Sequence, residues 1–374
     1  MKTITLFIYS IVIVLVLSCS SNNKSFEINK SITREIDLVS DSLFMSSCMI
    51  ELETSSDCKL GKNTNIIYAD DSLIILSSCD HVYKFNSKGK FIKEIGRLGN
   101  GHGEHGKIAS CTFDRIRKEI YICMMNNQMC IYDVNGVFKK KIDISDKGLI
   151  RCVAYTNELG LLGIKYEYNS NGLVCDVVFF NGKGEKKKEL PLYKDNLSFS
   201  VSIESFPIIY EYNKMLKIKL PFEDKLISLN KQLEFSATEF GLGDLAPNRR
   251  HIEDCDKRNE LYKKVQVLDI KESSRHLYLL CFYSMNYYAM IIDKVDYSIK
   301  FNKKIENPKM HGAIQYKTYA NIRFWPSYIS NGMTYCLIND ISPEIYKKLP
   351  IRKSSNDDYK EGKYNPIILI FKEK

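Results

Sequence analysis

One short phrase, an apolar strand end followed at once by a polar turn, occurs six times in this chain of 374 residues. Successive phrases are 47, 48, 49, 63 and 79 residues apart, because their last apolar residues are Phe85, Tyr132, Phe180, Leu229, Ile292 and Phe371. A period of this length is typical of radial β-repeats, in which each period forms one blade. The phrases therefore predict an all-β chain folded as a six-bladed β-propeller.

Composition and length agree with one large β domain over residues 36–374. The chain contains 24 Tyr and 18 Phe, and aromatic residues favour strands. A propeller must join its first and last blades, or two sheet edges stay unpaired. We expect a strand near Met49–Glu53 to complete the blade of the last strand, Ile367–Phe371. The final residues Lys372–Lys374 are expected to contribute charge and little burial.

The two long periods contain insertions. A charged stretch after Pro247 predicts a loop with one helical segment near 252–264, and Ser342 followed by Pro343 marks the start of a short helix. Insertions in repeat proteins fall in loops on one face, which is often the face that binds.

The first residues predict export. Leu6–Leu17 is apolar except for Tyr9 and Ser10, and it is too short to span a membrane, which takes about 20 residues. The segment ends in Ser18-Cys19 and resembles a bacterial lipobox, which implies cleavage after residue 18 and lipidation of Cys19. The alternative is an ordinary signal peptide with a chance cysteine. Residues 19–35 are polar and are expected to form a flexible tether between the lipid and the domain.

The formal net charge is +9, and cleavage after Ser18 removes only Lys2 from that balance. Many positive charges lie in short runs that follow a turn and open the next strand, at residues 88–90, 139–141 and 186–188. Lysines on outer strands discourage pairing between sheet edges of different molecules. The pattern and the predicted export therefore indicate no nucleic-acid partner.

Twelve cysteines are present, and with Cys19 acylated an odd number remains. The best candidate disulfide joins Cys123 and Cys130, which would lie opposite each other if Asn126-Asn127 formed a two-residue hairpin turn. The alternative is that both are small buried hydrophobic residues.

The glycine-rich segment Gly99–Gly103 lacks the Lys-Ser/Thr of a phosphate-binding loop and precedes a strand, so it predicts a tight crossing between blades with positive φ. His102 and His105, with Glu104 between them, are the candidate metal ligands, because neutral imidazole is a common ligand for divalent metals. No catalytic set can be read from the sequence. Trp325, the sole tryptophan, is expected to be buried beside a blade.

Four segments resemble the six-bladed β-propeller lipoproteins of Bacteroides-type bacteria, which are distantly similar to NHL-repeat propellers. They are Leu52–Ser55, Val82–Ile95, Gly96–Glu104 and Asn365–Lys372. One departure is that the usual Gly-Pro-Gly-Glu-Tyr of that group is Gly101-His102-Gly103-Glu104-His105 here. The resemblance implies the fold and an envelope location, and it supplies no catalytic residues.

Two functions remain open on this basis. One is a lipid-anchored binding or scaffold module, held to the outer membrane by its N-terminal lipid and facing the periplasm, with an envelope protein or an extracellular ligand as partner. The other is an NHL-type propeller hydrolase or lyase that uses a divalent metal in its channel.

The anchor gives a direct prediction. Cys19→Ala should abolish incorporation of radiolabelled fatty acid into the protein in growing cells, because the acylated thiol is lost, while Cys58→Ala should leave incorporation unchanged. A Cys19→Ala protein that still takes up label would show that the lipobox assignment is wrong.

Overall fold

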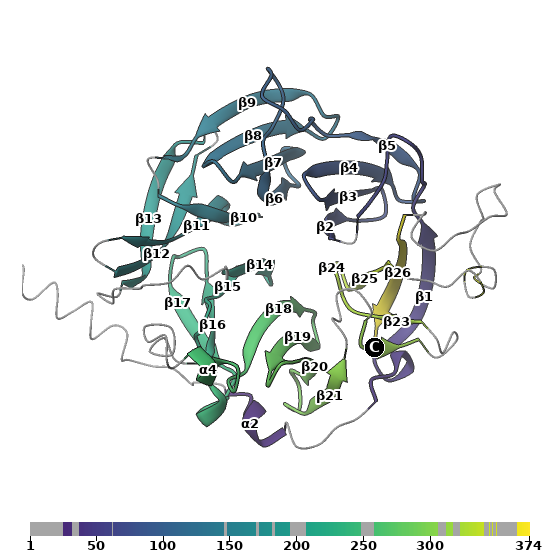
Figure 1. Ribbon diagram of the computed structural model, residues 1–374, viewed down its shortest axis with the longest axis vertical. Coiled ribbons are helices and arrows are strands. Elements are labelled where there is room, and N and C mark those ends of the chain that lie inside the picture. The colour runs from purple at the N-terminus through teal and green to yellow at the C-terminus, as the bar shows by residue number, and fades with distance from the viewer. Residues whose placement is uncertain are drawn as a thin grey trace, which may run out of the picture.

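The computed structural model describes residues 25–31, 37–61, 63–145, 148–169, 172–181, 184–194, 207–247, 258–305, 312–316, 322–339, 344, 346, 349 and 365–374. Six four-stranded antiparallel sheets stand around a central axis (Figure 1), so the predicted six-bladed β-propeller is confirmed. No helix within these ranges is both long enough and apolar enough to cross a bilayer.

Each blade runs from an inner strand beside the axis to an outer strand at the rim (Figure 1). Blades 1 to 3 consist of β2 (Thr64–Ala69), β3 (Leu73–Ser78), β4 (His81–Asn86), β5 (Phe91–Glu94); β6 (Ile108–Asp114), β7 (Glu119–Met124), β8 (Gln128–Asp133), β9 (Phe138–Asp143); and β10 (Ile150–Thr156), β11 (Gly160–Asn169), β12 (Gly172–Phe180), β13 (Lys186–Lys194). Blades 4 to 6 consist of β14 (Ile208–Tyr212), β15 (Met215–Lys219), β16 (Lys225–Leu229), β17 (Phe235–Glu239); β18 (Gln266–Glu272), β19 (His276–Tyr283), β20 (Asn286–Asp293), β21 (Ile299–Ile305); and β24 (Tyr328–Ser330), β25 (Met333–Ile338), β26 (Ile367–Glu373), β1 (Phe44–Glu51).

Short elements lie between or beside the blades. They are α2 (Ile28–Ser31), α4 (Arg258–Leu261), the 3-10 turns η1 (Ser40–Ser42) and η3 (Gly243–Leu245), and the two-stranded sheet of β22 (Ile314–Gln315) and β23 (Arg323–Phe324). Helix α4 falls inside the predicted helical segment 252–264. The predicted helix start at Ser342 and Pro343 lies outside the described residues.

The six phrases are the third strands of the six blades, and in blades 1 to 5 the polar turns after them have a common cause. The Asn86 side-chain oxygen accepts the backbone N–H groups of Lys88 and Lys90, at 2.9 Å each. Asp133 accepts two backbone N–H groups in the same way, from Asn135 at 2.8 Å and Val137 at 2.9 Å. Asparagine and aspartate favour such turns because their short side chains replace a backbone acceptor.

Apolar side chains fill the seam between each pair of neighbouring blades, which gives six separate cores. The seam between blades 5 and 6 contains Trp325, which is 4% exposed, as the sequence predicted. Phe324 and Phe371 stack in the same core with ring centroids 4.4 Å apart.

The ring closes through strands from opposite ends of the chain. Strand β1 pairs antiparallel with β26, with Cys48 opposite Ile370 and Ile50 opposite Ile368, so the predicted closure is confirmed. Asn365, just before β26, adds a second connection: its side-chain amide donates to the carbonyl oxygen of Glu53 at 2.7 Å and to that of Cys58 at 3.0 Å.

The prediction of a flexible tether over residues 19–35 is wrong for residues 25–31. The backbone N–H of Phe26 donates to Glu239 and that of Ile28 donates to Phe240, each at 3.1 Å. Ile28 is fully buried, because it and Phe26 insert into the core between blades 4 and 5. Residues 1–24, with the predicted signal peptide and Cys19, lie outside the described residues.

The expectation that the last three residues contribute little burial is wrong for Glu373, whereas Lys372 and Lys374 are exposed. Glu373 is 8% exposed. Its Oε1 lies 2.6 Å from His276 Nδ1 and accepts hydrogen bonds from Ser273 Oγ at 2.6 Å and Tyr278 OH at 3.0 Å. Burial acts to raise the pKa of Glu373, but the hydrogen bonds from these partners outweigh it and lower the pKa below its ordinary value. The carboxylate thereby fastens β26 to blade 5.

Glu373→Ala should lower the free energy of unfolding at pH 7 by about 3–5 kcal/mol, because it leaves the buried partners of the carboxylate unpaired. Since the folded pKa is below that of the unfolded chain, about 4.3, the contribution is fully present above that pH and declines as the pH falls through the folded value. Urea unfolding at pH 7 measures the loss of stability, and repeating it at pH 3 measures how far the contribution of Glu373 has declined. Lys372→Ala, on the exposed face of the same strand, should change stability by less than about 0.5 kcal/mol at either pH. Equal stability of the Glu373→Ala and Lys372→Ala proteins at pH 7 would refute the role given to Glu373.

Candidate functional site

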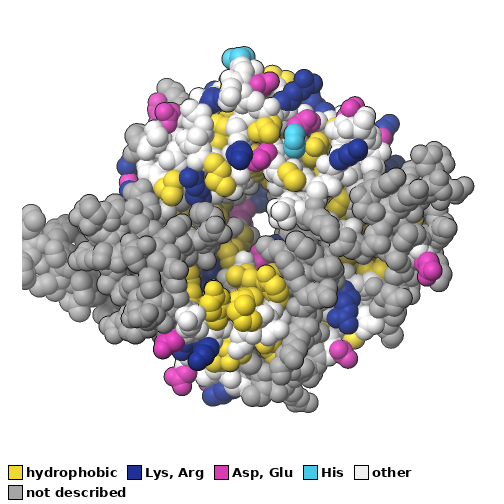
Figure 2. All heavy atoms as spheres, in the orientation of Figure 1, with side chains coloured by type: hydrophobic (Ala, Val, Ile, Leu, Met, Phe, Trp, Pro, Cys, Tyr) yellow, Lys and Arg dark blue, Asp and Glu magenta, His cyan; other side chains and the backbone are white. Residues whose placement is uncertain are grey.

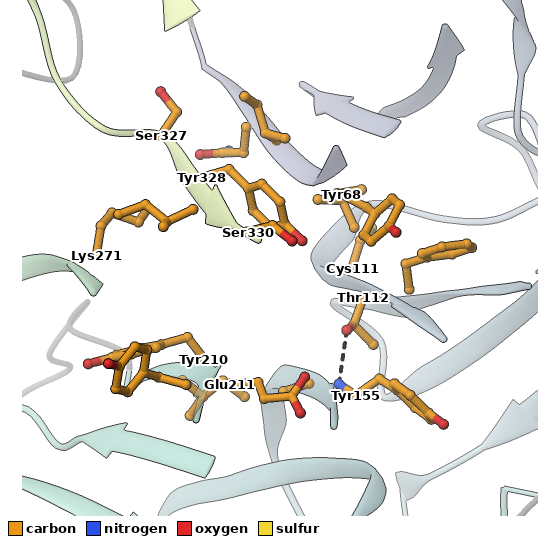
Figure 3. A pocket seen from close by; sticks show the side chains of 18 of the residues that line it. Tyr68, Cys111, Thr112, Tyr155, Tyr210, Glu211, Lys271, Ser327, Tyr328 and Ser330 are labelled. Atoms are coloured by element: carbon orange, nitrogen blue, oxygen red, sulfur yellow. Dashed lines mark hydrogen bonds between the residues drawn. The ribbon is translucent and has the colours of Figure 1, made fainter. Parts of the chain in front are cut away.

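The axis of the propeller contains a channel with a volume of about 800 Å³. Its wall consists mainly of the inner strands of all six blades, β2, β6, β10, β14, β18 and β24, and a central hollow is visible from one face (Figure 2). Side chains from these strands converge on it (Figure 3). The inner strands are less buried than the strands behind them: every residue of β14 is half-buried, whereas four of the five residues of β15 are buried.

Aromatic rings form one part of the wall. Tyr68 of blade 1 lies between Phe113 of blade 2 and Tyr328 of blade 6, with ring centroids 4.8 and 6.3 Å away. Tyr328 and Tyr68 point toward the channel together (Figure 3). Burial raises the pKa of Tyr328 to about 12, so its hydroxyl stays protonated at neutral pH.

Charged side chains form the opposite part, and each acid is paired. The Glu211 carboxylate of blade 4 lies 2.5 Å from Arg115 Nη2 of blade 2, and this ion pair extends across the end of blade 3. Asp269 pairs with Lys271 at 2.6 Å. Glu211, Asp269 and Glu272 are the acids among the described lining residues, and the bases there are Arg115, Lys214 and Lys271.

Glu272 connects the wall to the groups behind it. Its carboxylate forms an ion pair with Lys294 Nζ at 3.0 Å and accepts a hydrogen bond from the Tyr210 hydroxyl at 2.9 Å. The Lys294 ammonium lies 3.9 Å from the centroid of the Tyr212 ring, a cation–π contact. These contacts hold the two tyrosines of β14 against blade 5.

Hydroxyl groups of β6 fix the spacing of two inner strands. Thr112 Oγ1 accepts the backbone N–H of Tyr155 at 3.0 Å (Figure 3), and Ser110 Oγ accepts that of Val153 at 3.0 Å. Blades 2 and 3 are thus joined at the channel by side chains where no backbone ladder connects them.

Two lysines of β15 are buried behind this wall, in the seam between blades 4 and 5. Lys217 is 8% exposed and donates to Ser228 Oγ at 2.8 Å. Lys219 is 3% exposed and donates to the carbonyl oxygen of Leu220 at 2.6 Å. Burial lowers the pKa of both, to about 8 for Lys219.

The structure separates the two predicted metal ligands. His102 is exposed, with its ring edge-on to Phe138 at 5.1 Å, whereas His105 is completely buried. His105 Nδ1 lies 3.0 Å from the carbonyl oxygen of Gly106, and burial lowers the pKa of His105. Glu104 accepts the backbone N–H of Gly101 at 2.7 Å. Among the residues that the structure describes, no three His, Cys, Asp or Glu side chains form a group that could hold a metal ion.

The loop that contains these histidines is the predicted crossing between blades, from β5 to β6. The backbone N–H of Gly99 donates to the carbonyl oxygen of His105, and the backbone N–H of His105 donates to the carbonyl oxygen of Arg97, at 2.9 Å each. Gly103 has φ +78°, a value that favours glycine, so the prediction of positive φ is confirmed there.

The predicted disulfide between Cys123 and Cys130 is wrong, because the hairpin loop has three residues instead of two. Cys123 pairs with Met129 and Cys130 pairs with Ile122, and the third loop residue, Asn127, has φ +58°. The extra residue shifts the register by one and turns the two cysteines to opposite faces of blade 2. Both are buried free thiols, in different seams, as the alternative prediction stated.

The channel residues were missed from the sequence. A signal was present in segments such as Tyr210-Glu211-Tyr212 and Asp269-Ile270-Lys271-Glu272, where polar and apolar residues alternate two strands before each repeated phrase. Because the inner strand of a propeller blade lines the axis, this alternation could have marked the polar positions as channel residues.

Residues 23–372 match the family model described as "Domain of unknown function (DUF4934)". A putative exported protein from Bacteroides fragilis is similar in structure, with a TM-score of 0.67 and 16% identity over 91% of this chain and 98% of that chain. A member of the duf4221 family from Bacteroides vulgatus has a TM-score of 0.51 and 10% identity over the same shares of the two chains. These likenesses support the fold. No curated protein matches the chain.

The buried lysine of β15 gives a prediction with a defined pH window. Lys219→Met should raise the free energy of unfolding at pH 7 by up to about 3 kcal/mol, because the folded protein no longer disfavours a charge there. The unfolded chain binds more protons than the folded one between pH 8 and 10.5, so wild-type stability rises through that window and the variant's advantage disappears by its upper end. Urea unfolding at pH 7 and pH 10.5 tests this, with exposed Lys231→Met as the control. An advantage that is absent at pH 7, or equal at both pH values, would contradict the prediction.

Proposed function

The chain belongs to the DUF4934 family. We propose that it is a lipid-anchored binding protein of the bacterial cell envelope and that it holds a small ligand in its central channel. The observation that carries the proposal is the channel itself, because all six blades supply side chains to it. Its volume of about 800 Å³ falls in the range of sites for small molecules and cofactors.

The proposed location rests on two supports. The sequence around Cys19 resembles a lipobox, and the similar protein from Bacteroides fragilis is described as a putative exported protein. We place the chain in the outer membrane with the propeller facing the periplasm, because Ser20 is not an inner-membrane retention signal and no acidic residue directly follows Cys19.

The chemistry of the wall favours a polar ligand without a strong net charge. Acids and bases are equal in number among the described lining residues, and all three acids already have cationic partners, so a cationic ligand would have to break an existing ion pair. Paired side chains can still accept and donate hydrogen bonds, and the rings of Tyr68 and Tyr328 offer apolar surface for a ring of the ligand.

The test is to compare what the protein carries from its native membrane. Wild-type protein, Ser330→Trp and Val137→Trp are purified without denaturant, and the small molecules released on unfolding are identified by mass spectrometry. Ser330 lies at the channel (Figure 3), so a tryptophan there should exclude the ligand. Val137 is 60% exposed away from the channel lining and controls for the substitution.

We expect one or more compounds to accompany wild type and Val137→Trp at about equal amounts and to be reduced at least about tenfold in Ser330→Trp, the ratio that 1.4 kcal/mol of lost affinity produces. The melting temperatures of the variants establish that both are folded. The same compounds at equal amounts in all three proteins, or none in wild type, would refute binding in the channel.

A further inference from the structure

Blade 5 carries an exposed apolar patch, defined here as the tip patch: Tyr262, Leu268 and Met285. Their exposed fractions are 47%, 39% and 68%. Hydrophobic side chains gather over β18 and β19 on this face (Figure 2). The backbone N–H of Ser284 donates to the carbonyl oxygen of Tyr262 at 2.7 Å, which holds the connection after α4 against the β19–β20 hairpin.

The backbone at the hairpin tip is poorly suited to its residues. Tyr283 pairs with Asn286, so Ser284 and Met285 form a two-residue turn, and their φ values are +47° and +63°. Turns of this kind favour Asn-Gly, because a long side chain at positive φ is strained. The fold therefore places a flexible apolar side chain in water at a position where glycine would be more stable.

A second irregularity exposes another member of the tip patch. The register between β18 and β19 shifts between Val267 and Asp269, so Leu268 is an extra residue without a partner in the ladder. Such bulges redirect side chains, and this one leaves Leu268 exposed. The same shift occurs between the first two strands of blades 1 to 3, and in blade 5 it combines with the hairpin turn to present apolar groups to the surroundings.

The N-terminal segment enters the body of the protein at the same blade. Phe26 and Ile28 lie in the apolar core between blades 4 and 5, against which Val267 and Tyr283 also pack. Only five residues separate Cys19 from docked Ser25, and a chain of this length spans at most about 20 Å. A lipid on Cys19 would therefore hold this part of the propeller close to the bilayer.

We propose that the tip patch rests on the phospholipid leaflet in which the Cys19 lipid is anchored. This inference depends on the lipidation within the proposed function. Apolar and tyrosine side chains suit the boundary between headgroups and acyl chains, and their burial adds to the hold of a lipid chain. Three exposed side chains are too few for a stable interface with another protein, which takes about 800 Å² from each partner.

The experiment uses the mature chain, residues 19–374, with Cys19→Ser, so that binding does not come from the lipid. Vesicles of phosphatidylethanolamine and phosphatidylglycerol are sedimented with the protein, and the bound fraction gives a partition coefficient. We expect measurable binding that falls about tenfold or more when Met285→Asp and Leu268→Asp are combined, because both apolar groups leave the interface. Ile116→Asp is the matched control, since Ile116 is 68% exposed, as Met285 is, and lies between β6 and β7 of blade 2.

A second variant separates binding from folding. Met285→Gly should keep or raise the melting temperature, because glycine accepts φ +63° without strain, while binding to vesicles falls. The inference is overturned if the tip-patch variants bind vesicles as wild type does, or if the Cys19→Ser chain does not bind at all. It is also overturned if Met285→Asp converts a dimer to a monomer in sedimentation velocity, because a second copy would then be the occupant. Lipid incorporation at Cys19 is measured separately, so a failed anchor and a failed tip patch give different results.

Discussion

The pairing of β1 with β26 is the interaction on which the rest of the propeller depends. Each blade buries its two faces against its neighbours, so an open ring would expose two apolar faces and two unpaired strand edges at once. The side chain of Asn365 binds the chain that follows β1, and Glu373 at the far end of β26 binds blade 5. The last strand is thus held at both ends by buried polar groups, whose geometry fixes the register that apolar side chains alone would leave free to slip.

The sequence predicted the blade count because the signal is local and repeated. In blades 1 to 5 the turn after the third strand is capped by a local Asn or Asp such as Asn86 or Asp133, and no distant partner is needed to recognise it. Predictions failed where the outcome depended on distant contacts or on one residue of loop length. A single extra loop residue separated Cys123 from Cys130, and Ile28 is buried in a seam formed by residues of blades 4 and 5, about 180 or more positions further along the chain.

The channel illustrates the same limit. Its ion pair joins Arg115 of blade 2 to Glu211 of blade 4, and only the curvature of the ring brings these two side chains together. Sequence alternation can mark the inner strands as half-polar, but the pairing of their charges is a property of the closed ring. Because the acids of the wall already have cationic partners, a ligand has to match an existing arrangement of donors, acceptors and rings. Selectivity in this channel therefore follows from shape and hydrogen bonding more than from net charge.

Each seam of the propeller contains one buried cysteine thiol, which can serve as a chemical probe of that seam. All ten cysteines among the described residues are free thiols, and one buried thiol lies in each of the six interblade cores: Cys58, Cys130, Cys123, Cys175, Cys281 and Cys336. Burial raises the pKa of Cys123 and Cys281 to about 12, so neither forms a reactive thiolate in the closed ring at neutral pH. An alkylating reagent can reach such a thiol only when its seam opens. The order in which the six thiols are modified would therefore record the order in which the blades separate, without any engineered probe.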